Sequence, residues 1–205
     1  PLDQIVELAQ KYDTIVMIDE AHAVGILGEK GTGAAEYFGL DKKIDIQMGT
    51  LSKAAGVFGA YCCGSKSLID FLINCARSFI YTTGLPPFVA ACARRAIEII
   101  EEEPHRRTRL AKHSEYMRRE LNRMGFDTLE SQTPIIPILV KDPNRAVEFS
   151  RKLFESGIFV QAIRPPTVPM NTARLRLTVM ATHQQNDLDF VLEEFQQTGK
   201  ELCLI

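Results

Sequence analysis

The sequence predicts an α/β chain in two parts, a mainly parallel sheet followed by a smaller α+β layer. Residues 14–18, TIVMI, form a short apolar run that is typical of a strand buried on both faces of a parallel sheet. In the second half the pattern becomes strand, helix, strand, strand and helix, which is typical of helices on one face of a sheet. The 205 residues, 45% of them hydrophobic, suffice for one large or two small domains. We place a domain boundary near residue 100, between residues 1–100 and 101–205.

The elements of the first half follow from apolar spacing and from glycine. Apolar residues that recur on one side of a helix mark the first element, and short apolar runs mark the strands. In chain order we expect a helix over residues 2–12, a strand over 14–18, a glycine-rich loop over 25–33, strands over 45–49 and 59–64, and a helix over 66–78.

Prolines and glycines bound the elements of the second half. Pro86 and Pro87 open a long helix and Pro104 ends it, since proline is tolerated in the first turn but not in the interior. A second helix runs to Met124, with Gly125 as the residue that follows its end. The remaining elements are a strand over 135–140, a helix over 142–155, strands over 159–163 and 173–180, and a helix over 186–197. The strand over 173–180 alternates leucine with arginine, which predicts one exposed face.

Charge and cysteine content disfavour several classes of protein. The net charge is −2 and no half of the chain is basic, which argues against a nucleic-acid surface. No apolar run reaches the roughly 18 residues that a membrane span needs. The five cysteines and four histidines lack ligand spacing, so we expect no metal site and reduced, partly buried thiols, as in a cytoplasmic protein. The first ten residues indicate an amphipathic helix rather than a leader, and we expect the sequence to begin within a longer protein.

The tetrapeptide Asp19-Glu20-Ala21-His22 raises one alternative, because these four letters mark the DEAH class of ATP-driven helicases. Such a motor needs a G-x-x-x-x-G-K-[ST] phosphate loop, arginines that reach the γ-phosphate, and a basic channel for the nucleic acid. The sequence contains no such loop, no arginine-finger motif and no basic stripe. A DEAH-type ATPase is therefore disfavoured.

A different interpretation comes from Lys53, in the stretch MGTLSKAAG. It follows a predicted strand and lies among hydroxyl and small residues, the setting of a lysine that forms a Schiff base, although a surface loop lysine is the alternative. Asp19 ends a predicted buried strand and therefore needs a partner, which a pyridinium nitrogen would supply. His22 is placed to bind the 3-oxygen of the same ring, although a satisfied core histidine is the alternative. Together these residues favour pyridoxal 5'-phosphate (PLP) as the cofactor.

Five motifs carry a resemblance to a known family: IDEAHAVG, GTLSKA, YTTGLPP, IRPPTVP and ARLRLT. Over essentially its whole length the sequence resembles the α-oxoamine synthases, fold-type I PLP-dependent transferases that condense an amino acid with an acyl-CoA and release CO2. The resemblance implies that residues 1–100 are the C-terminal part of the large PLP-binding domain and residues 101–205 the small C-terminal α+β domain. It also implies a cytoplasmic homodimer with the site at the subunit interface.

The resemblance gives a role to each residue near the cofactor. Lys53 corresponds to the lysine that binds PLP covalently and later moves the α-proton of the amino acid. Asp19 corresponds to the partner of the pyridine nitrogen, and His22 to the partner of the ring 3-oxygen. Thr50 corresponds to a cofactor-contacting hydroxyl, and Ser52 is a less certain neighbour.

Further residues correspond to phosphate and substrate contacts. Thr82 and Thr83 correspond to a pair that reaches the phosphate of the neighbouring subunit's cofactor. Two hydroxyls and a glycine before a proline-started helix suit an anion, although helix capping is the alternative. Thr167 corresponds to a substrate contact, with a simple turn residue as the alternative. Arg174 corresponds to the arginine that binds the amino-acid carboxylate, for which a bidentate fork is suited; Arg176, on the same strand face, is the runner-up.

The substrates and the state of the chain stay open. The nearest resemblance implies L-alanine and a pimeloyl thioester, as in biotin synthesis. Sister synthases of the 2-amino-3-ketobutyrate CoA ligase or 5-aminolevulinate synthase type are the alternative. The family's N-terminal half holds a ring-stacking histidine, a phosphate loop and an acyl pocket, none of which is present. We therefore expect the free 205-residue chain to be inactive and poorly folded, and an inactive fragment with a structural role is the non-enzyme alternative.

Overall fold

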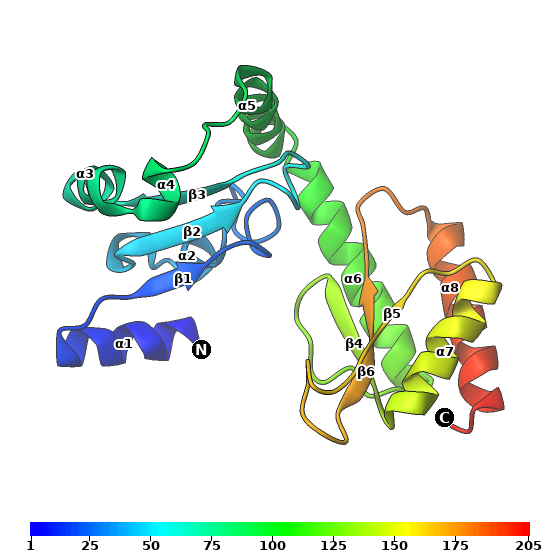
Figure 1. The fold of residues 1–205 in the computed structure, drawn as a ribbon. Coiled ribbons are helices and arrows are strands. Elements are labelled where there is room, and N and C mark those ends of the chain that lie inside the picture. The colour runs from blue at the N-terminus through cyan, green and yellow to red at the C-terminus, as the bar shows by residue number, and fades with distance from the viewer. The chain divides into compact units, whose positions relative to one another are not determined.

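The computed structural model describes residues 1–205, which form two compact units, Pro1–Arg107 and Thr108–Ile205 (Figure 1). Each unit contains a three-stranded sheet of its own. None of the helices combines the length and the apolar character that crossing a membrane requires.

The first unit contains the sheet β1-β2-β3, in which β2 is central. β1 runs parallel to β2, and β3 runs antiparallel to it. The expected order of elements is confirmed with small shifts at their ends, except that the helix expected over residues 66–78 is interrupted at Ala76 and that the short helix over residues 34–37 was not expected. The elements are α1 (Leu2–Tyr12), β1 (Met17–Asp19), α2 (Ala34–Tyr37), a 3-10 turn (Asp41–Lys43), β2 (Ile46–Thr50), β3 (Ala60–Gly64), α3 (Lys66–Cys75), α4 (Arg77–Ile80) and α5 (Pro87–Glu102).

The core of the first unit is small and lies around α1 and the start of β1. Its buried members come from α1, the approach to β1, α2 and the turn that follows α2. They are Val6, Ala9, Val16, Ala35, Leu40 and Ile44, with Leu2 and Ile18 packed against them. The amphipathic pattern of residues 2–12 thus packs its apolar side inward, as expected.

Two expectations of burial are wrong. β1 was expected to be buried on both faces, but Ile15 and Met17 are 76% and 61% exposed. Successive side chains point to opposite faces of the strand: Val16 and Ile18 pack into the core, whereas Ile15 and Met17 lie on the other, exposed face. The strand also begins at Met17 rather than Thr14, because the Val16 amide donates to the Asp45 carboxylate at 2.8 Å. The cysteines are exposed rather than partly buried; they are Cys62, Cys63, Cys75, Cys92 and Cys203.

The second unit is an antiparallel sheet in the order β4-β6-β5, packed against helices as the sequence predicts. The centre of its core is an aromatic cluster of Phe126, Phe149 and Phe195, whose ring centroids lie 5.3 to 6.0 Å apart. The elements are β4 (Ile135–Lys141), α7 (Pro143–Glu155), β5 (Gln161–Ile163), β6 (Ala173–Thr178) and α8 (Gln185–Glu201), preceded by α6 (His105–Arg123), which begins in the first unit. In Figure 1 the helices α7 and α8 lie on one side of this sheet.

Capping residues explain where the helices of the second unit begin and end. The Asp142 carboxylate accepts a hydrogen bond from the Arg145 amide at 2.8 Å, and Pro143 occupies the first turn of α7. Gly125 and Gly157 follow α6 and α7 with φ of 100° and 89°, a backbone conformation that strongly favours glycine. These three boundaries agree with the sequence.

Candidate active site

Asp19 and the segment containing Lys53 lie at one edge of the first sheet. Asp19 is the last residue of β1 and pairs with Met48 of β2. The Glu20 amide donates to the Met48 carbonyl at 2.7 Å, so the parallel pairing continues one residue further. Both strands end at the same edge, because they are parallel, and β2 leads directly into Lys53. Ligands of open α/β sheets bind at this carboxyl edge.

The Asp19 carboxylate is exposed and only partly used by the protein. Its Oδ1 accepts a hydrogen bond from the Ala21 amide at 2.8 Å, and Oδ2 accepts none. The expectation of a buried carboxylate is therefore wrong for this chain, because the Asp19 side chain lies on the same exposed face of β1 as Met17. His22 lies in the turn that follows and is also exposed. Asp19 thus keeps one oxygen able to accept a hydrogen bond from a ligand.

The loop between β2 and β3 presents Lys53. The Gly56 amide donates to the Lys53 carbonyl at 3.0 Å, and the Val57 amide donates to the Leu51 carbonyl at 2.8 Å. These bonds close a tight turn with Lys53 on its surface, so the lysine is exposed rather than desolvated. The Lys53 ammonium takes part in none of the salt bridges of this chain.

The two hydroxyls near Lys53 differ in what they can still bind. Thr50 Oγ1 donates to the Gly59 carbonyl at 3.1 Å and accepts from the Ser52 amide at 3.2 Å. It also lies 2.7 Å from Ser52 Oγ. A hydroxyl has a single hydrogen to donate, so Ser52 Oγ must be the donor in that contact. Thr50 is then fully used within the loop, whereas Ser52 Oγ can still accept a hydrogen bond.

Thr82 and Thr83 lie in an exposed, irregular segment between α4 and α5. The N-cap residue of α5 is Pro86, and no side chain caps this helix. The helix-capping alternative is therefore wrong for both threonines. Neither hydroxyl forms a hydrogen bond with the chain, so both are available to an external group.

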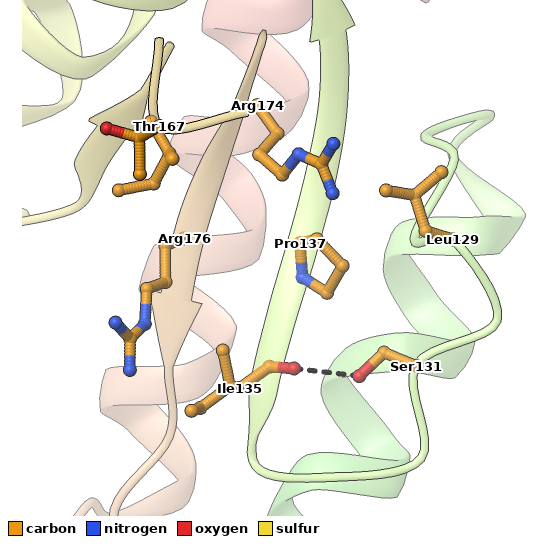
Figure 2. Close-up of a pocket in the computed structure, with 8 residues that line it drawn as sticks. Leu129, Ser131, Ile135, Pro137, Thr167, Arg174 and Arg176 are labelled. Carbon is orange, nitrogen blue, oxygen red and sulfur yellow. Dashed lines mark hydrogen bonds between the residues drawn. The ribbon is translucent and has the colours of Figure 1, made fainter. Parts of the chain in front are cut away.

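The remaining candidates surround a pocket of about 470 Å³ in the second unit. Figure 2 shows Arg174 and Arg176 extending from β6, with Arg174 directed toward Leu129 and Pro137 and the two guanidinium groups diverging. Thr167 borders the same pocket. The lining residues are Leu129, Ser131, Ile135, Pro137, Ile163, Thr167, Arg174 and Arg176.

The pocket is suited to an anion with an apolar portion. None of its lining residues is acidic, and half of them are aliphatic. Arg174 Nε donates to the Thr172 carbonyl at 2.9 Å, which fixes the side chain while both terminal nitrogens remain free for a carboxylate. Arg176 makes no hydrogen bond within the protein. Both arginines face the pocket because alternate residues of β6, Leu175 and Leu177, are buried in the core.

Glu20 and Tyr61 also lie beside the edge that holds Asp19 and Lys53, although the sequence assigned neither residue a role. Tyr61 pairs with Gly49, and a Cβ at Gly49 would lie 2.4 Å from the Tyr61 hydroxyl oxygen. Burial raises the pKa of the Tyr61 phenol, and the nearby Cys63 and Glu20 side chains act in the same direction. The glycine in GTLSK, Gly49, signals that another group approaches the backbone closely, but only the strand register identifies that group as Tyr61. Glu20 is almost completely buried, at 1% exposure. The sequence offers no signal for this burial, because glutamate is ordinarily an exposed residue.

Comparison with known proteins defines the class of this chain. Residues 1–195 match the family model for aminotransferases of class I and II, and the chain belongs to this family. Curated relatives named 8-amino-7-oxononanoate synthase are similar to it along its whole length. Those of Thermosipho melanesiensis and Lysinibacillus sphaericus are each 47% identical over 205 residues. The chain covers 52% and 53% of these relatives, so it spans about half of their length.

Solved structures agree with this family and confirm the resemblance to the α-oxoamine synthases. A serine palmitoyltransferase of Sphingomonas wittichii is 30% identical and has a TM-score of 0.95, with all of this chain and 52% of that chain covered. An 8-amino-7-oxononanoate synthase of Francisella tularensis is also 30% identical, with a TM-score of 0.83 over 97% of this chain and 58% of that chain. The expected fold-type I architecture is therefore confirmed.

Proposed function

We propose that this chain contributes the PLP-binding lysine and aspartate to an 8-amino-7-oxononanoate synthase. The single observation that carries the proposal is the shared edge of two parallel strands, where Asp19 ends β1 and Lys53 follows β2. The similarity to relatives of that name supports it. A lysine-to-alanine variant of a serine palmitoyltransferase of S. paucimobilis, 30% identical to this chain, has been solved with a PLP–myriocin aldimine bound.

The residues at this edge fit PLP. Asp19 has an oxygen that accepts no protein hydrogen bond, as required of an acceptor for a protonated pyridine nitrogen. Lys53 is exposed and has no ion-pair partner, so its amine can reach a carbonyl carbon. Ser52 Oγ retains acceptor capacity, while Thr50 acts by holding the loop. When bound, PLP supplies an electron sink for the carbanion at the amino-acid α-carbon.

Each residue then has a defined task. Asp19 keeps the ring nitrogen protonated, and His22 donates to the ring 3-oxygen. Lys53 binds the cofactor and moves the proton at the substrate α-carbon. Arg174 binds the amino-acid carboxylate, with Arg176 as the runner-up, and Thr167 contacts the substrate at the same pocket.

The reaction we propose joins L-alanine to a pimeloyl thioester. A bond forms between the α-carbon of alanine and the acyl carbon, the thioester C–S bond breaks, and the thiol leaves with a proton. The bond from the α-carbon to the carboxylate also breaks, which releases CO2, and the α-carbon takes up a proton in its place. The two arginines of the pocket suit the carboxylate of an amino acid, and its apolar residues suit a small side chain such as that of alanine. A sister synthase acting on acetyl-CoA or succinyl-CoA is the second candidate, and serine with a palmitoyl thioester is the third because serine palmitoyltransferases are close in structure.

The proposal includes a cytoplasmic homodimer in which Thr82 and Thr83 reach the phosphate of the partner's cofactor. Their exposure and their unbonded hydroxyls support this assignment. It also assigns residues 1–100 to the large PLP-binding domain and residues 101–205 to the small C-terminal domain.

The proposal is tested by trapping the cofactor on its lysine. Purified protein is incubated with PLP, reduced with borohydride, digested and analysed by mass spectrometry. We expect a pyridoxyl adduct on Lys53 that is absent from Lys53→Ala. Lys66, which forms an exposed ion pair with Asp70 at 2.8 Å, serves as the matched lysine and should remain unmodified. Equal labelling of Lys53 and Lys66 would overturn the assignment.

Because the free chain is expected to be inactive, substrate choice is tested separately, in a full-length enzyme that contains this chain and has passed the trapping experiment. Release of free thiol is followed with L-alanine, glycine or serine, each combined with pimeloyl, acetyl, succinyl or palmitoyl thioesters. We expect the highest kcat/KM for L-alanine with the pimeloyl thioester. A preference for another pair would replace the proposed substrates and leave the cofactor assignment intact.

A further inference from the structure

Glu20 is a buried carboxylate for which the proposed reaction has no use. It is 1% exposed, and none of the ion pairs of the chain includes it. Its Oε2 accepts a hydrogen bond from the Ala34 amide at 2.7 Å, and its Oε1 accepts one from the Ala35 amide at 2.9 Å. These amides open α2, directly after the glycine-rich loop. Breaking either of these two hydrogen bonds would leave a buried polar group unsatisfied, which costs free energy. The carboxylate therefore stabilises the position of both amides.

The backbone of Glu20 holds the turn that contains His22. Its amide donates to Met48 of β2 at 2.7 Å, as described above. Its carbonyl accepts from the Ala23 amide at 2.8 Å and from the Val24 amide at 3.0 Å. One residue therefore joins the end of β1, the neighbouring strand, the turn and the start of α2.

The glycine-rich loop is shaped to accept the Glu20 carboxylate. Gly33 has a φ of 128°, and a Cβ at this position would lie 2.6 Å from Glu20 Oε2. The space that a side chain would fill is thus taken by the carboxylate. The other side of the loop is held independently by Glu36, which accepts from the Lys30 amide at 2.7 Å and the Thr32 amide at 2.9 Å.

We infer that Glu20 is a positioning residue, which fixes the end of β1 with Asp19 and the following turn with His22 against β2 and the glycine-rich loop. It touches neither cofactor nor substrate; it acts through Asp19, its neighbour in sequence, and through His22. The part of this inference that concerns the cofactor rests on the proposed function.

Hydrogen–deuterium exchange of the purified protein tests the positioning without any cofactor. Glu20→Gln retains the shape of the side chain but turns one acceptor into a donor that faces an amide. We expect amide exchange about tenfold faster at residues 34 and 35 and also at residues 21–24, because the loss of a buried hydrogen bond frees both segments. Gly33→Ala, which displaces the carboxylate from the other side, should give the same pattern.

The matched control is Glu36→Gln, which loosens the same loop at a different point. It should raise exchange at residues 30 and 32 and leave residues 21–24 at the wild-type rate. If residues 21–24 keep their wild-type rate in both Glu20→Gln and Gly33→Ala, the inference is overturned. The inference is also overturned if Glu36→Gln accelerates exchange at residues 21–24 as much as Glu20→Gln does.

Titration with PLP provides a second readout on the same variants. We expect the Kd for PLP to rise about tenfold in Glu20→Gln and to remain unchanged in Glu36→Gln, with Glu20→Asp recovering part of the loss. Faster exchange at residues 21–24 with an unchanged Kd would overturn the positioning role. If wild-type protein binds no PLP, the proposed function fails, while the exchange pattern still decides whether Glu20 fixes the turn.

Discussion

The two arginines of β6 differ in how much of each guanidinium the protein already uses. Arg174 is held by the Thr172 carbonyl, and Arg176 makes no internal hydrogen bond. We expect Arg174→Gln to raise the KM for the amino acid about tenfold or more, as loss of a charged hydrogen bond commonly costs about 1.5–3 kcal/mol. Arg176→Gln is the matched variant, because it lies two residues along the same face. Steady-state kinetics with the amino acid varied decides: a larger KM effect in Arg176→Gln would exchange the two roles.

Tyr61 makes stability depend on pH in the alkaline range. Burial raises the pKa of its phenol above the ordinary value of about 10, with smaller contributions from Cys63 and Glu20. A group whose pKa is higher in the folded state stabilises the protein below its unfolded pKa, and this contribution is lost as pH rises through the folded pKa. We therefore expect the free energy of unfolding to decrease above about pH 10, and to decrease less steeply in Tyr61→Phe. Denaturant unfolding at several pH values measures this, and identical slopes for both proteins would contradict it.

At the residue scale, the sequence predicted the position of residues along the elements better than their exposure. Asp19 ends a strand and Lys53 follows one, as expected, since a short apolar run is a local signal. The exposure of Asp19 depends on what packs against its face of β1, and the burial of Glu20 depends on amides fourteen and fifteen residues away. Neither relation leaves a local signal. Thr50 was favoured over Ser52, whereas only the loop geometry reveals that its hydroxyl is already fully used.

At the scale of elements, boundaries marked by proline, glycine or a capping side chain were predictable, and others were not. Pro87, Gly125 and Gly157 lie at the ends of helices as expected. The helix expected over residues 66–78 is interrupted at Ala76, whose ψ of 98° is extended, so that α3 and α4 are separate. Alanine is the best helix former, and nothing in the local sequence signals this break.

The N-cap of α7 provides a direct test of how these boundary signals stabilise the second unit. Asp142→Ala removes the acceptor of the Arg145 amide, and we expect it to lower the free energy of unfolding by about 1 kcal/mol. Asp142→Asn is the control, because asparagine is an equally good N-cap residue and should retain most of the stability. Chemical denaturation followed by circular dichroism measures both. Equal losses in the two variants would show that the charge of Asp142, rather than its cap, stabilises α7.

At the scale of the whole molecule, the two units differ in how completely their apolar side chains are buried. Most of the large side chains below 2% exposure belong to the second unit, including Phe149, Phe195 and Met117. The first unit instead exposes large apolar groups on several elements, such as Phe58, Phe88 and Met17. Burial of apolar surface is the main favourable contribution to folding. The expectation that the free chain folds poorly is therefore best applied to residues 1–107.

This difference predicts two separate unfolding events in the 205-residue chain. The second unit should be the more stable one, with slow hydrogen exchange in β4, β6 and α7, while residues 1–107 exchange faster and are cleaved first by protease.

Phe149→Ala removes a ring from the aromatic cluster and should lower the stability of the second unit by about 3–5 kcal/mol. Exchange in the first unit should remain unchanged, because its core contains none of these residues. Phe88→Ala, at a ring that is 70% exposed, is the matched control and should leave the second unit unaffected. A single transition in which Phe149→Ala accelerates exchange equally in both units would show that the chain folds as one cooperative body, and that the exposed apolar groups of the first unit do not limit its stability.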